Sequence, residues 1–329
     1  YYFGADGTAV SGWQSIGGDK YYFYPESHDM AYGRVQIDGK NYFLNTPGAN
    51  ADGRMQHSGW IYDSIYGKWL YATSNGELLT GWQNIGGTWY YFNEYGVMLT
   101  GWIDDSGTWY YANASGAMAT GWLNIGSTWY YLDGSGAMAA NVWRGLGDSW
   151  YWFGDSGAMA TGWFLAGGSW YYASGSGAMA TGWLGNGGTW YWLGSSGAMA
   201  SNSWVNVGGV WYWFDDSGAM ATGWRQIGGA WYYFSGSGAM AHNAWVGDYY
   251  LQSSGAMATN TWVGSYYVGE DGKWIPGYGL VWYKNGSEVY HTHKCRTVGK
   301  DAKGYSQISI QEAQKRGASR ECKNCQQIS

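Results

Sequence analysis

The stretch "TGWLNIGSTWYYLDGSGAMA", residues 120–139, decides the fold because it recurs along the chain. Close copies are "TGWFLAGGSWYYASGSGAMA" and "TGWRQIGGAWYYFSGSGAMA". The tryptophans that align in this pattern are spaced by 20 or 21 residues: Trp82, Trp102, Trp122, Trp143, Trp163, Trp183, Trp204, Trp224 and Trp245. A fixed period of this length is typical of a repeat architecture. We therefore predict an array of repeats rather than two independent globular domains.

Each repeat has the pattern of a β-hairpin. In residues 80–99, Gly86-Gly87 separates a run that ends at Ile85 from the β-branched and aromatic run at 88–92. Two such runs around a Gly-Gly pair predict a hairpin, and "DGSG" or "SGSG" predicts the turn to the next one. One hairpin is marginally stable in water, so the units must stack. The predicted fold is all-β, a β-hairpin solenoid of about 20-residue units.

Composition and charge exclude several classes of protein. Aromatic residues make up 20% of the 329 residues, and glycine is the most frequent residue at 57. Residues 1–275 carry a net charge of −11 and residues 276–329 a net charge of +5. The array lacks the clustered cations that bind phosphates, so no nucleic-acid partner is expected. No run of 18 apolar residues occurs, so no membrane span is expected.

The aromatic triplet of each repeat has two kinds of position. Side chains alternate along a strand, so Trp89 and Tyr91 are expected on one face and Tyr90 on the other. The middle residue is always tyrosine, at positions 90, 110, 130, 151, 171, 191, 212 and 232. The third is tyrosine or tryptophan. The middle position therefore requires a hydroxyl and a ring, whereas the third requires only a π face.

The last 50 or so residues contain all three cysteines and a metal-ligand pattern. His291 lies four residues before Cys295, and Cys322 lies three residues before Cys325. Two such pairs predict a structural Zn²⁺ site, with His293 as an alternative fourth ligand. The other interpretation is a Cys322–Cys325 disulfide with Cys295 unpaired.

A short helix is predicted between the ligand pairs. Ser309 and Glu312 have the spacing of a capping box, and Gly317 is placed as a C-terminal stop. The cysteines and the change in charge indicate a boundary near "EDGKWIPGYG", residues 270–279. The predicted domains are divergent hairpin repeats at 1–79, regular repeats at 80–274 and a small α+β zinc-binding domain at 275–329.

The repeats resemble the cell-wall-binding, or choline-binding, repeats of Gram-positive surface proteins and phage lysins. The resemblance covers roughly residues 10–274 and is strongest from Thr80 to Met257, where "TGW…WYYF…SGAM" recurs. It implies a secreted or cell-surface protein of a bacterium or phage. The implied function is non-catalytic anchoring, through choline groups of (lipo)teichoic acid caged between adjacent hairpins. Related arrays bind α-glucans or other glycans, so a carbohydrate-binding array of a secreted enzyme, toxin or adhesin is the alternative.

The resemblance also implies which residues bind the ligand. In choline-binding members, the Trp of the Gly-Trp pair, a triplet aromatic, an aromatic of the next unit and a Met form a cage. One such cage would use Trp102, Trp109, Tyr131 and Met118, with strand parity favouring Tyr131 over Tyr130. The candidate ligand-binding residues are Trp82, Trp89, Met98, Trp102, Trp109, Tyr111, Met118, Trp122, Trp129, Tyr131, Met138, Trp163, Trp170, Tyr172, Met179, Trp183, Trp190, Trp224, Trp231 and Tyr233.

Some repeats depart from the pattern. The Gly before the Trp is replaced in "AANVW", "SNSW", "HNAW" and "TNTW", which end at Trp143, Trp204, Trp245 and Trp262. These junctions are expected to bend the solenoid or to lack a good cage. Residues 24–79 lose the full triplet, so complete cages are not expected there.

The tail resembles the Ada-type zinc-binding fold over about residues 278–326. The DNA-repair member of that family uses a cysteine as methyl acceptor where this chain has His291, so methyl transfer to that position is excluded. In the repeats, the pairs Asp104-Asp105 and Asp215-Asp216 occupy turn positions and are expected to be solvated rather than catalytic. The chain begins within a broken repeat, so a catalytic domain, such as a cell-wall hydrolase, is expected only upstream of it.

Overall fold

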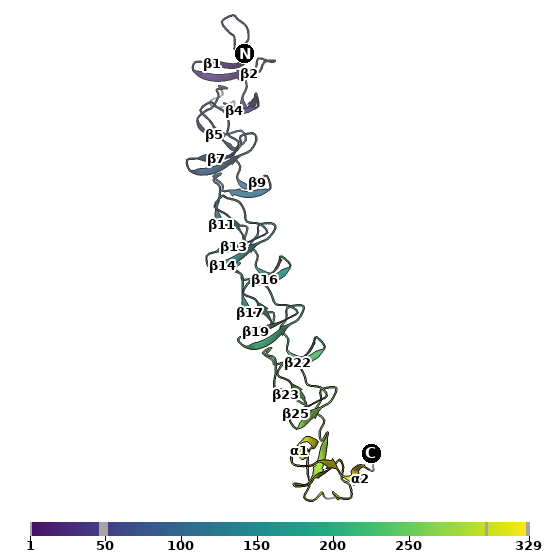
Figure 1. Ribbon diagram of the computed structural model, residues 1–329. Coiled ribbons are helices and arrows are strands. Elements are labelled where there is room, and N and C mark those ends of the chain that lie inside the picture. Colours follow the sequence, from purple (N-terminus) through teal and green to yellow (C-terminus); the bar gives the residue numbers. More distant parts are fainter. Residues whose placement is uncertain (1, 46–51, 300–301, 327–329) are drawn as a thin grey trace. The chain divides into compact units, whose positions relative to one another are not determined.

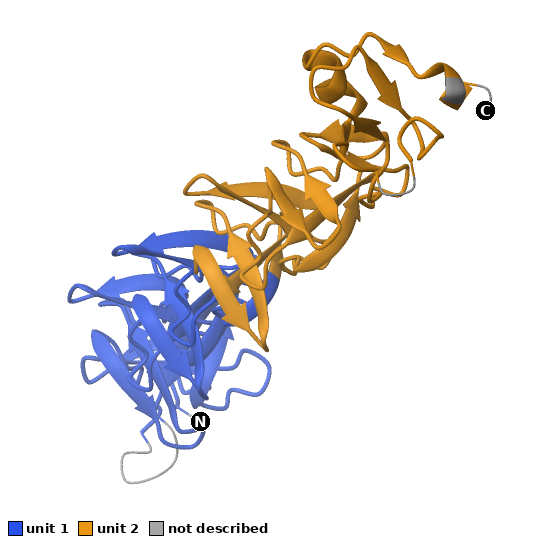
Figure 2. Ribbon diagram, turned by 90° about the horizontal axis from the view of Figure 1, so that it is seen from below, with its two compact units in different colours: residues 1–164, 173–179 blue, residues 165–172, 180–329 orange. Residues whose placement is uncertain are grey.

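The structure, a computed structural model, describes residues 2–45, 52–299 and 302–326. Successive two-stranded antiparallel hairpins are followed by a small mixed sheet with two short helices (Figure 1). The predicted repeat fold of β-hairpins is confirmed. The chain divides into two compact units, residues 1–164 with 173–179 and residues 165–172 with 180–329 (Figure 2). Within the described ranges, no helix has the length and apolar character needed to cross a membrane.

The hairpins of both units consist of paired strands of three to five residues. The hairpins of the first unit are β1 (Gly12–Ile16) with β2 (Asp19–Phe23), β3 (Gly33–Ile37) with β4 (Lys40–Leu44), β5 (Gly59–Asp63) with β6 (Lys68–Ala72), β7 (Gly81–Ile85) with β8 (Thr88–Phe92), β9 (Gly101–Asp105) with β10 (Thr108–Ala112), β11 (Gly121–Ile125) with β12 (Thr128–Leu132), and β13 (Val142–Leu146) with β14 (Ser149–Phe153). Those of the second are β17 (Gly182–Asn186) with β18 (Thr189–Leu193), β19 (Ser203–Val207) with β20 (Val210–Phe214), β21 (Gly223–Ile227) with β22 (Ala230–Phe234), β23 (Ala244–Val246) with β24 (Tyr249–Leu251), and β25 (Thr261–Val263) with β26 (Tyr266–Val268). The division between the units falls within β15 (Gly162–Ala166) and β16 (Ser169–Ala173).

The hairpin turns explain the paired glycines. Gly86 and Gly87 have φ angles of +62° and +88°. Positive φ at both central residues defines the type I′ turn, whose twist matches that of the flanking strands. Residues other than glycine rarely adopt positive φ angles. The Gly-Gly pair therefore fits this turn without strain, although a serine adopts one of the two positive φ angles at Ser106 and Ser127.

The strand register divides each hairpin into two faces. Trp122 is paired with Tyr131 and Leu123 with Tyr130. The face that carries the two tryptophans and the third triplet residue is called the front face, and the face with the middle tyrosine is the back face. The predicted alternation of the triplet is confirmed.

The core lies where the front face of one hairpin meets the back face of the next. Phe153, the last residue of β14, is fully buried and its ring centroid lies 5.8 Å from that of Trp122 and 6.1 Å from that of Tyr131. The same strand-end position is fully buried in other hairpins, at Phe92, Ala112, Leu132, Leu193, Phe214 and Phe234. The apolar area buried between hairpins stabilises what a single hairpin could not.

The Gly-Ala-Met segment of a regular repeat ties its hairpin to the preceding hairpin. The amide of Met138 donates a hydrogen bond to the carbonyl of Trp109, at 2.8 Å, and the amide of Ala139 donates to its own hairpin at Tyr131, also at 2.8 Å. The Met side chain then packs on the glycine of the following turn. A Cβ atom at Gly157 would collide with the Met138 side chain. This arrangement is called the methionine clamp.

At the irregular junctions the left-handed residue is an asparagine two positions before the tryptophan, in place of a glycine directly before it. Asn141, Asn202, Asn243 and Asn260 have φ angles between +44° and +49°. Asparagine tolerates the left-handed region better than most residues. The pairing that follows is unchanged, since Trp204 lies opposite Trp213 as Trp122 does opposite Tyr131.

The C-terminal segment forms a four-stranded sheet. Its strand order is β29 (Ser306–Ser309), β27 (Leu280–Tyr283), β28 (Val289–His291) and β30 (Arg320–Glu321), with helices α1 (Ile310–Lys315) and α2 (Lys323–Gln326). The Ser309 hydroxyl accepts a hydrogen bond from the Glu312 amide at 3.1 Å, and Gly317, with φ of +100°, follows the helix. The predicted short helix is confirmed. Val281, Tyr283, Ala313 and Ala318 form the core between α1 and the sheet.

Candidate functional site: aromatic cages and a buried His–Cys cluster

A cavity of about 310 Å³ lies between the front face of β11–β12 and the next hairpin, lined by Trp122, Trp129, Tyr151, Met159, Gly175 and Ser176. The Trp122 ring centroid is 6.1 Å from that of Trp129 and 5.0 Å from that of Tyr151, at interplanar angles of 88° and 75°. These rings stand roughly perpendicular to one another around the cavity. Because Trp122 and Trp129 are 41% and 44% exposed, the cavity is open to solvent. Trp122, Trp129, Tyr151 and Met159 are called the Trp122 cage.

The same arrangement occurs in the second unit. A cavity of about 350 Å³ is lined by the Trp204 cage (Trp204, Trp211, Tyr232 and Met240), with Ser253 and Ser254. A cavity of about 280 Å³ is lined by the Trp224 cage (Trp224, Trp231, Tyr249 and Met257), with Asp271. Each cage thus takes two tryptophans from one hairpin, the middle tyrosine of the next and the methionine that follows it.

Ring contacts of the same type recur at other junctions within each unit. The tryptophan of one hairpin lies 4.8–4.9 Å from the middle tyrosine of the next in the pairs Trp60–Tyr90, Trp82–Tyr110, Trp102–Tyr130 and Trp183–Tyr212. The methionine amide donates to the carbonyl of the second tryptophan at 2.9 Å or less in the pairs Met98–Trp69, Met118–Trp89, Met138–Trp109 and Met220–Trp190.

The predicted tyrosine of the Trp102 cage is wrong. Tyr130 lies 4.8 Å from Trp102, whereas Tyr131 lies 5.5 Å from Trp122 in its own hairpin. The reason is that Tyr131 is on the front face and points toward the following hairpin. Only the back-face tyrosine points toward the preceding tryptophan.

The same correction applies to the other third-position tyrosines. Tyr111 and Tyr233 lie 5.2 and 5.3 Å from the tryptophans of their own hairpins, Trp102 and Trp224. The middle tyrosines were missed as cage residues. Their invariance among the repeats was the signal that could have identified them.

The predicted methionine of the Trp102 cage is also wrong. The amide of Met138, not that of Met118, donates to the carbonyl of Trp109. Met118 belongs one junction earlier, where it donates to Trp89. Each cage methionine bonds to the hairpin that precedes its own. The methionine of a cage therefore belongs to the repeat after the one that supplies the two tryptophans.

One further expectation is corrected and one group of candidates is set apart. The absence of glycine before Trp204 does not remove its cage, because Asn202 supplies the left-handed residue. Within 24–79, Trp60 makes the cage contact with Tyr90 at 4.9 Å. The predicted residues Trp163, Trp170, Tyr172 and Met179 lie where the chain divides into its two units and are assigned to no cage.

Cations replace tryptophans at the first junctions. Met55 donates its amide to the carbonyl of Lys20, which occupies the position of the second cage tryptophan. Arg34 occupies the position of the first; its Nε lies 3.2 Å from Oδ2 of Asp63, which is 1% exposed, and its guanidinium lies 4.9 Å from the Tyr66 ring centroid. A fixed cation repels a cationic ligand. Because Lys20 and Arg34 stand where the other junctions have tryptophan rings, these junctions lack a complete aromatic cage.

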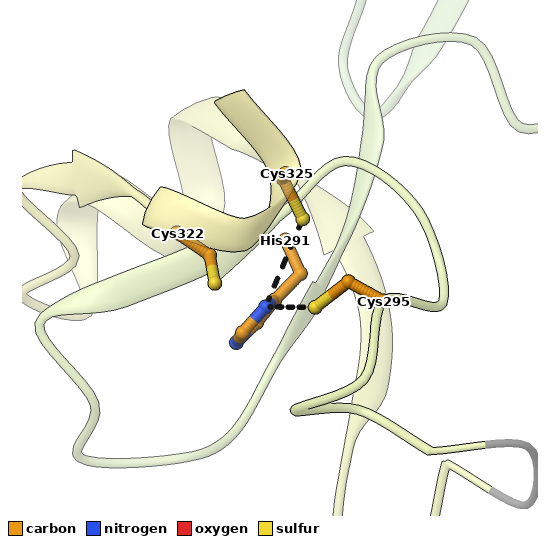
Figure 3. A group of neighbouring side chains, drawn as sticks. All are labelled: His291, Cys295, Cys322 and Cys325. Atoms are coloured by element: carbon orange, nitrogen blue, oxygen red, sulfur yellow. Dashed lines mark hydrogen bonds between the residues drawn. The ribbon is translucent and has the colours of Figure 1, made fainter. Parts of the chain in front are cut away.

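In the C-terminal sheet, four buried side chains point toward one centre (Figure 3). His291 ends β28, Cys295 lies in the loop after it, and Cys322 and Cys325 lie before and within α2. The ligand atoms are all within 4.8 Å of one another, and His291 Nδ1 is 3.3 Å from Cys295 Sγ. In a tetrahedral Zn²⁺ site with Zn–S bonds of about 2.3 Å, ligand atoms lie roughly 3.8 Å apart. The structure selects His291 rather than His293 for this group.

Two thiols of this cluster, Cys295 and Cys325, have shifted pKa values. Burial raises the pKa of the Cys325 thiol. Burial also acts to raise that of Cys295, but hydrogen bonds from the Val298 and Thr297 amides and from His291 outweigh it and lower the pKa to about 6. A lowered pKa favours the thiolate, which is the form that binds metals. The cysteines are free in the structure, so the disulfide interpretation is not supported.

Comparison with known families agrees with the geometry of the repeats. The choline-binding repeat family matches residues 79–119, 99–143, 143–181 and 202–245, and a second choline-binding repeat matches residues 239–274. A putative cell wall binding repeat matches residues 11–25 and 181–199. These matches end before the His–Cys cluster.

Solved structures of whole relatives are also similar. CbpJ from Streptococcus pneumoniae is 34% identical with a TM-score of 0.54, over 75% of this chain and 100% of that chain. Choline binding protein F from the same species is 33% identical with a TM-score of 0.51, over 76% of this chain and 99% of that one. Glucosyltransferase-S from Streptococcus mutans serotype c is 39% identical over 85 residues, which is 26% of this chain and 6% of that protein. The chain therefore belongs to the choline-binding repeat family.

Proposed function

We propose that the repeats hold choline groups of a Gram-positive surface polymer, such as (lipo)teichoic acid, and thereby attach a secreted protein to the cell wall. The observation that carries the proposal is the Trp122 cage, in which three aromatic residues and a methionine line one open cavity. A trimethylammonium group donates no conventional hydrogen bonds, so ring faces are its natural partners. Each ring contributes roughly 0.5–2 kcal/mol.

Repetition makes weak cages effective. Complete cages recur in both units, including the Trp122, Trp204 and Trp224 cages. A polymer that carries many choline groups can engage several cages at once. Multivalent binding of this kind raises avidity by about 10²–10⁴ over a single site.

A cell-wall partner is supported by a relative. Choline binding protein F has been solved in the presence of a peptidoglycan analogue, a tetrasaccharide-pentapeptide. We propose a cell-wall polymer as the partner of this chain as well, and a location at the bacterial surface. The described chain acts in this proposal as a binding module, and any catalytic step belongs to another domain of the same protein.

The second candidate function is glucan binding. The similarity to part of Glucosyltransferase-S favours it, and sugar rings also stack on tryptophan and tyrosine. The two candidates differ in what the rings recognise. A choline cage requires the positive charge of the ligand, whereas a sugar platform does not.

Calorimetric titration separates these functions. Choline should bind, and its neutral isostere 3,3-dimethylbutanol should not, because the two differ only in the charge that attracts the rings. The protein should be retained on a choline resin and released by free choline. Equal affinity for both compounds, or retention on dextran without choline binding, would replace the choline proposal with the glucan one.

We also propose that His291, Cys295, Cys322 and Cys325 hold one structural Zn²⁺. The support is the burial and convergence of the four ligand atoms. Zinc would cross-link β28, the loop after it and α2, which form a core too small to be stable by apolar burial alone.

Metal analysis of the purified chain tests this proposal. We expect about one zinc per chain, lost in Cys322→Ser and retained in His293→Ala, because His293 lies outside the cluster. Full zinc occupancy in Cys322→Ser would remove that residue from the site. Loss of zinc in His293→Ala alone would favour the alternative ligand.

A further inference from the structure

One cage differs from the others at its rim. A glycine in the turn of the following repeat packs on each cage methionine. The residue directly before this glycine is serine at positions 115, 135, 156, 176, 237 and 254. Ser176 and Ser254 line the cavities of the Trp122 and Trp204 cages. At the Trp224 cage this residue is Asp271, which lines the cavity.

The aspartate keeps the structural role of the serine. Ser254 Oγ accepts a hydrogen bond from the Ala256 amide at 3.3 Å. In the next turn, Asp271 Oδ1 accepts from the Lys273 amide at 3.0 Å. The carboxylate has a second oxygen, Oδ2, which this turn does not use. Asp271 therefore adds a charged acceptor to the cavity without altering the turn.

The charged residues around Asp271 do not neutralise its carboxylate. The nearest cation in sequence, Lys273, places its Nζ 3.6 Å from Oδ2 of Asp248 and is thus paired with a different carboxylate. Glu270, beside Asp271, is exposed and adds negative charge. The rim of the Trp224 cage is therefore anionic, whereas the rim of the Trp204 cage carries Ser253 and Ser254.

We propose that Asp271 makes the Trp224 cage favour ammonium groups that carry an N–H, such as protonated dimethylamino and primary amino alcohols, relative to quaternary ammonium groups, more than the serine-rimmed cages do. This inference rests on the proposed cation-binding function of the cages. A serine-rimmed cage offers an N–H group mainly ring faces, and burying a donor without a good acceptor is costly. Asp271 Oδ2 supplies a charge-assisted acceptor at the open side of the cavity.

The methionines permit a measurement at single cages in the full chain. Each cage contains its own methionine among the 11 of the sequence. With ¹³C-methyl methionine, the Met257 signal reports the Trp224 cage and the Met240 signal reports the Trp204 cage. The two signals are assigned with Met257→Leu and Met240→Leu. Titrations with choline and with N,N-dimethylethanolamine then give a ratio of the two dissociation constants for each cage.

We expect the dimethylethanolamine-to-choline ratio of dissociation constants to be about tenfold smaller at Met257 than at Met240. Asp271→Ser should raise the Met257 ratio to the Met240 value, and Ser254→Asp should lower the Met240 ratio. Both changes preserve the turn acceptor, so both variants are expected to fold.

The result separates this inference from the function on which it rests. Equal ratios at the two cages, or an unchanged Met257 ratio in Asp271→Ser, with clear choline binding at both, would overturn the role of Asp271 alone. If choline shifts neither methyl signal, the proposed choline function itself fails, and this inference fails with it.

Discussion

Replacing Gly136 by alanine should destabilise its junction by about 2–5 kcal/mol, with two separate causes. Gly136 has φ of +86°, and a left-handed conformation costs a residue with a Cβ about 1–2 kcal/mol. The added Cβ would also collide with the Met118 side chain. Overpacking of this kind costs about 1–3 kcal/mol. The sum gives the expected range.

The same turn contains a matched control. Gly134 lacks a positive φ, and a Cβ there would meet no atom within 4 Å. Gly134→Ala should therefore change stability by less than about 0.5 kcal/mol. In a Met118→Ala background the collision disappears, so the cost of Gly136→Ala should fall to about 1–2 kcal/mol, the backbone part alone.

Native-state hydrogen exchange is the appropriate assay, because a repeat array does not unfold as one two-state unit. The amide of Met118, which donates to the carbonyl of Trp89 at 2.9 Å, reports the opening of this junction. If Gly136→Ala costs no more than Gly134→Ala, the reasoning about the methionine clamp is refuted. If its cost is the same with and without the Met118 side chain, the collision is not its cause.

Two further substitutions test the cages and the first junctions. Tyr232→Leu should weaken choline binding at its cage about 2- to 30-fold, as followed by the Met240 methyl signal, because one ring is lost; Tyr233→Leu should not, and the opposite order would restore the third-position assignment. Arg34→Ala should cost about 2 kcal/mol or more of local stability in native-state hydrogen exchange, since it leaves the buried Asp63 carboxylate without its cation. Lys40→Ala, which removes an exposed pair, should cost less than about 1 kcal/mol; equal costs would show that burial of the partner does not matter.

The hairpin fold could be predicted from the sequence because its signals are local. Gly86-Gly87 specifies a turn type, and the alternation around Tyr90 specifies two faces. The helix that begins after Ser309 was predictable for the same reason, since a cap is formed by residues within one turn. Each of these features is determined by residues that are neighbours in the chain.

The membership of the cages could not be predicted in this way. Parity places Tyr131 on a face but does not say whether that face meets the preceding or the following hairpin. The stacking direction decides it, and this direction results from contacts such as the one between Tyr131 and Phe153, 22 residues apart in the sequence. The irregular junction at Trp204 was misjudged for a different reason. Glycine was treated as necessary, whereas Asn202 adopts the same left-handed backbone.

The methionine clamp places each cage out of phase with the repeat that encodes it. The Trp122 cage begins at Trp122 and is completed by Met159, with the turn at Ser176 at its rim, so it draws on three successive repeats. A gene duplication that copies one period, starting at any point within it, would therefore create one new complete site and leave the existing sites intact. Loss of one period would remove one site in the same way. Recombination can therefore lengthen or shorten such an array by one cage at a time, wherever within the repeat it occurs.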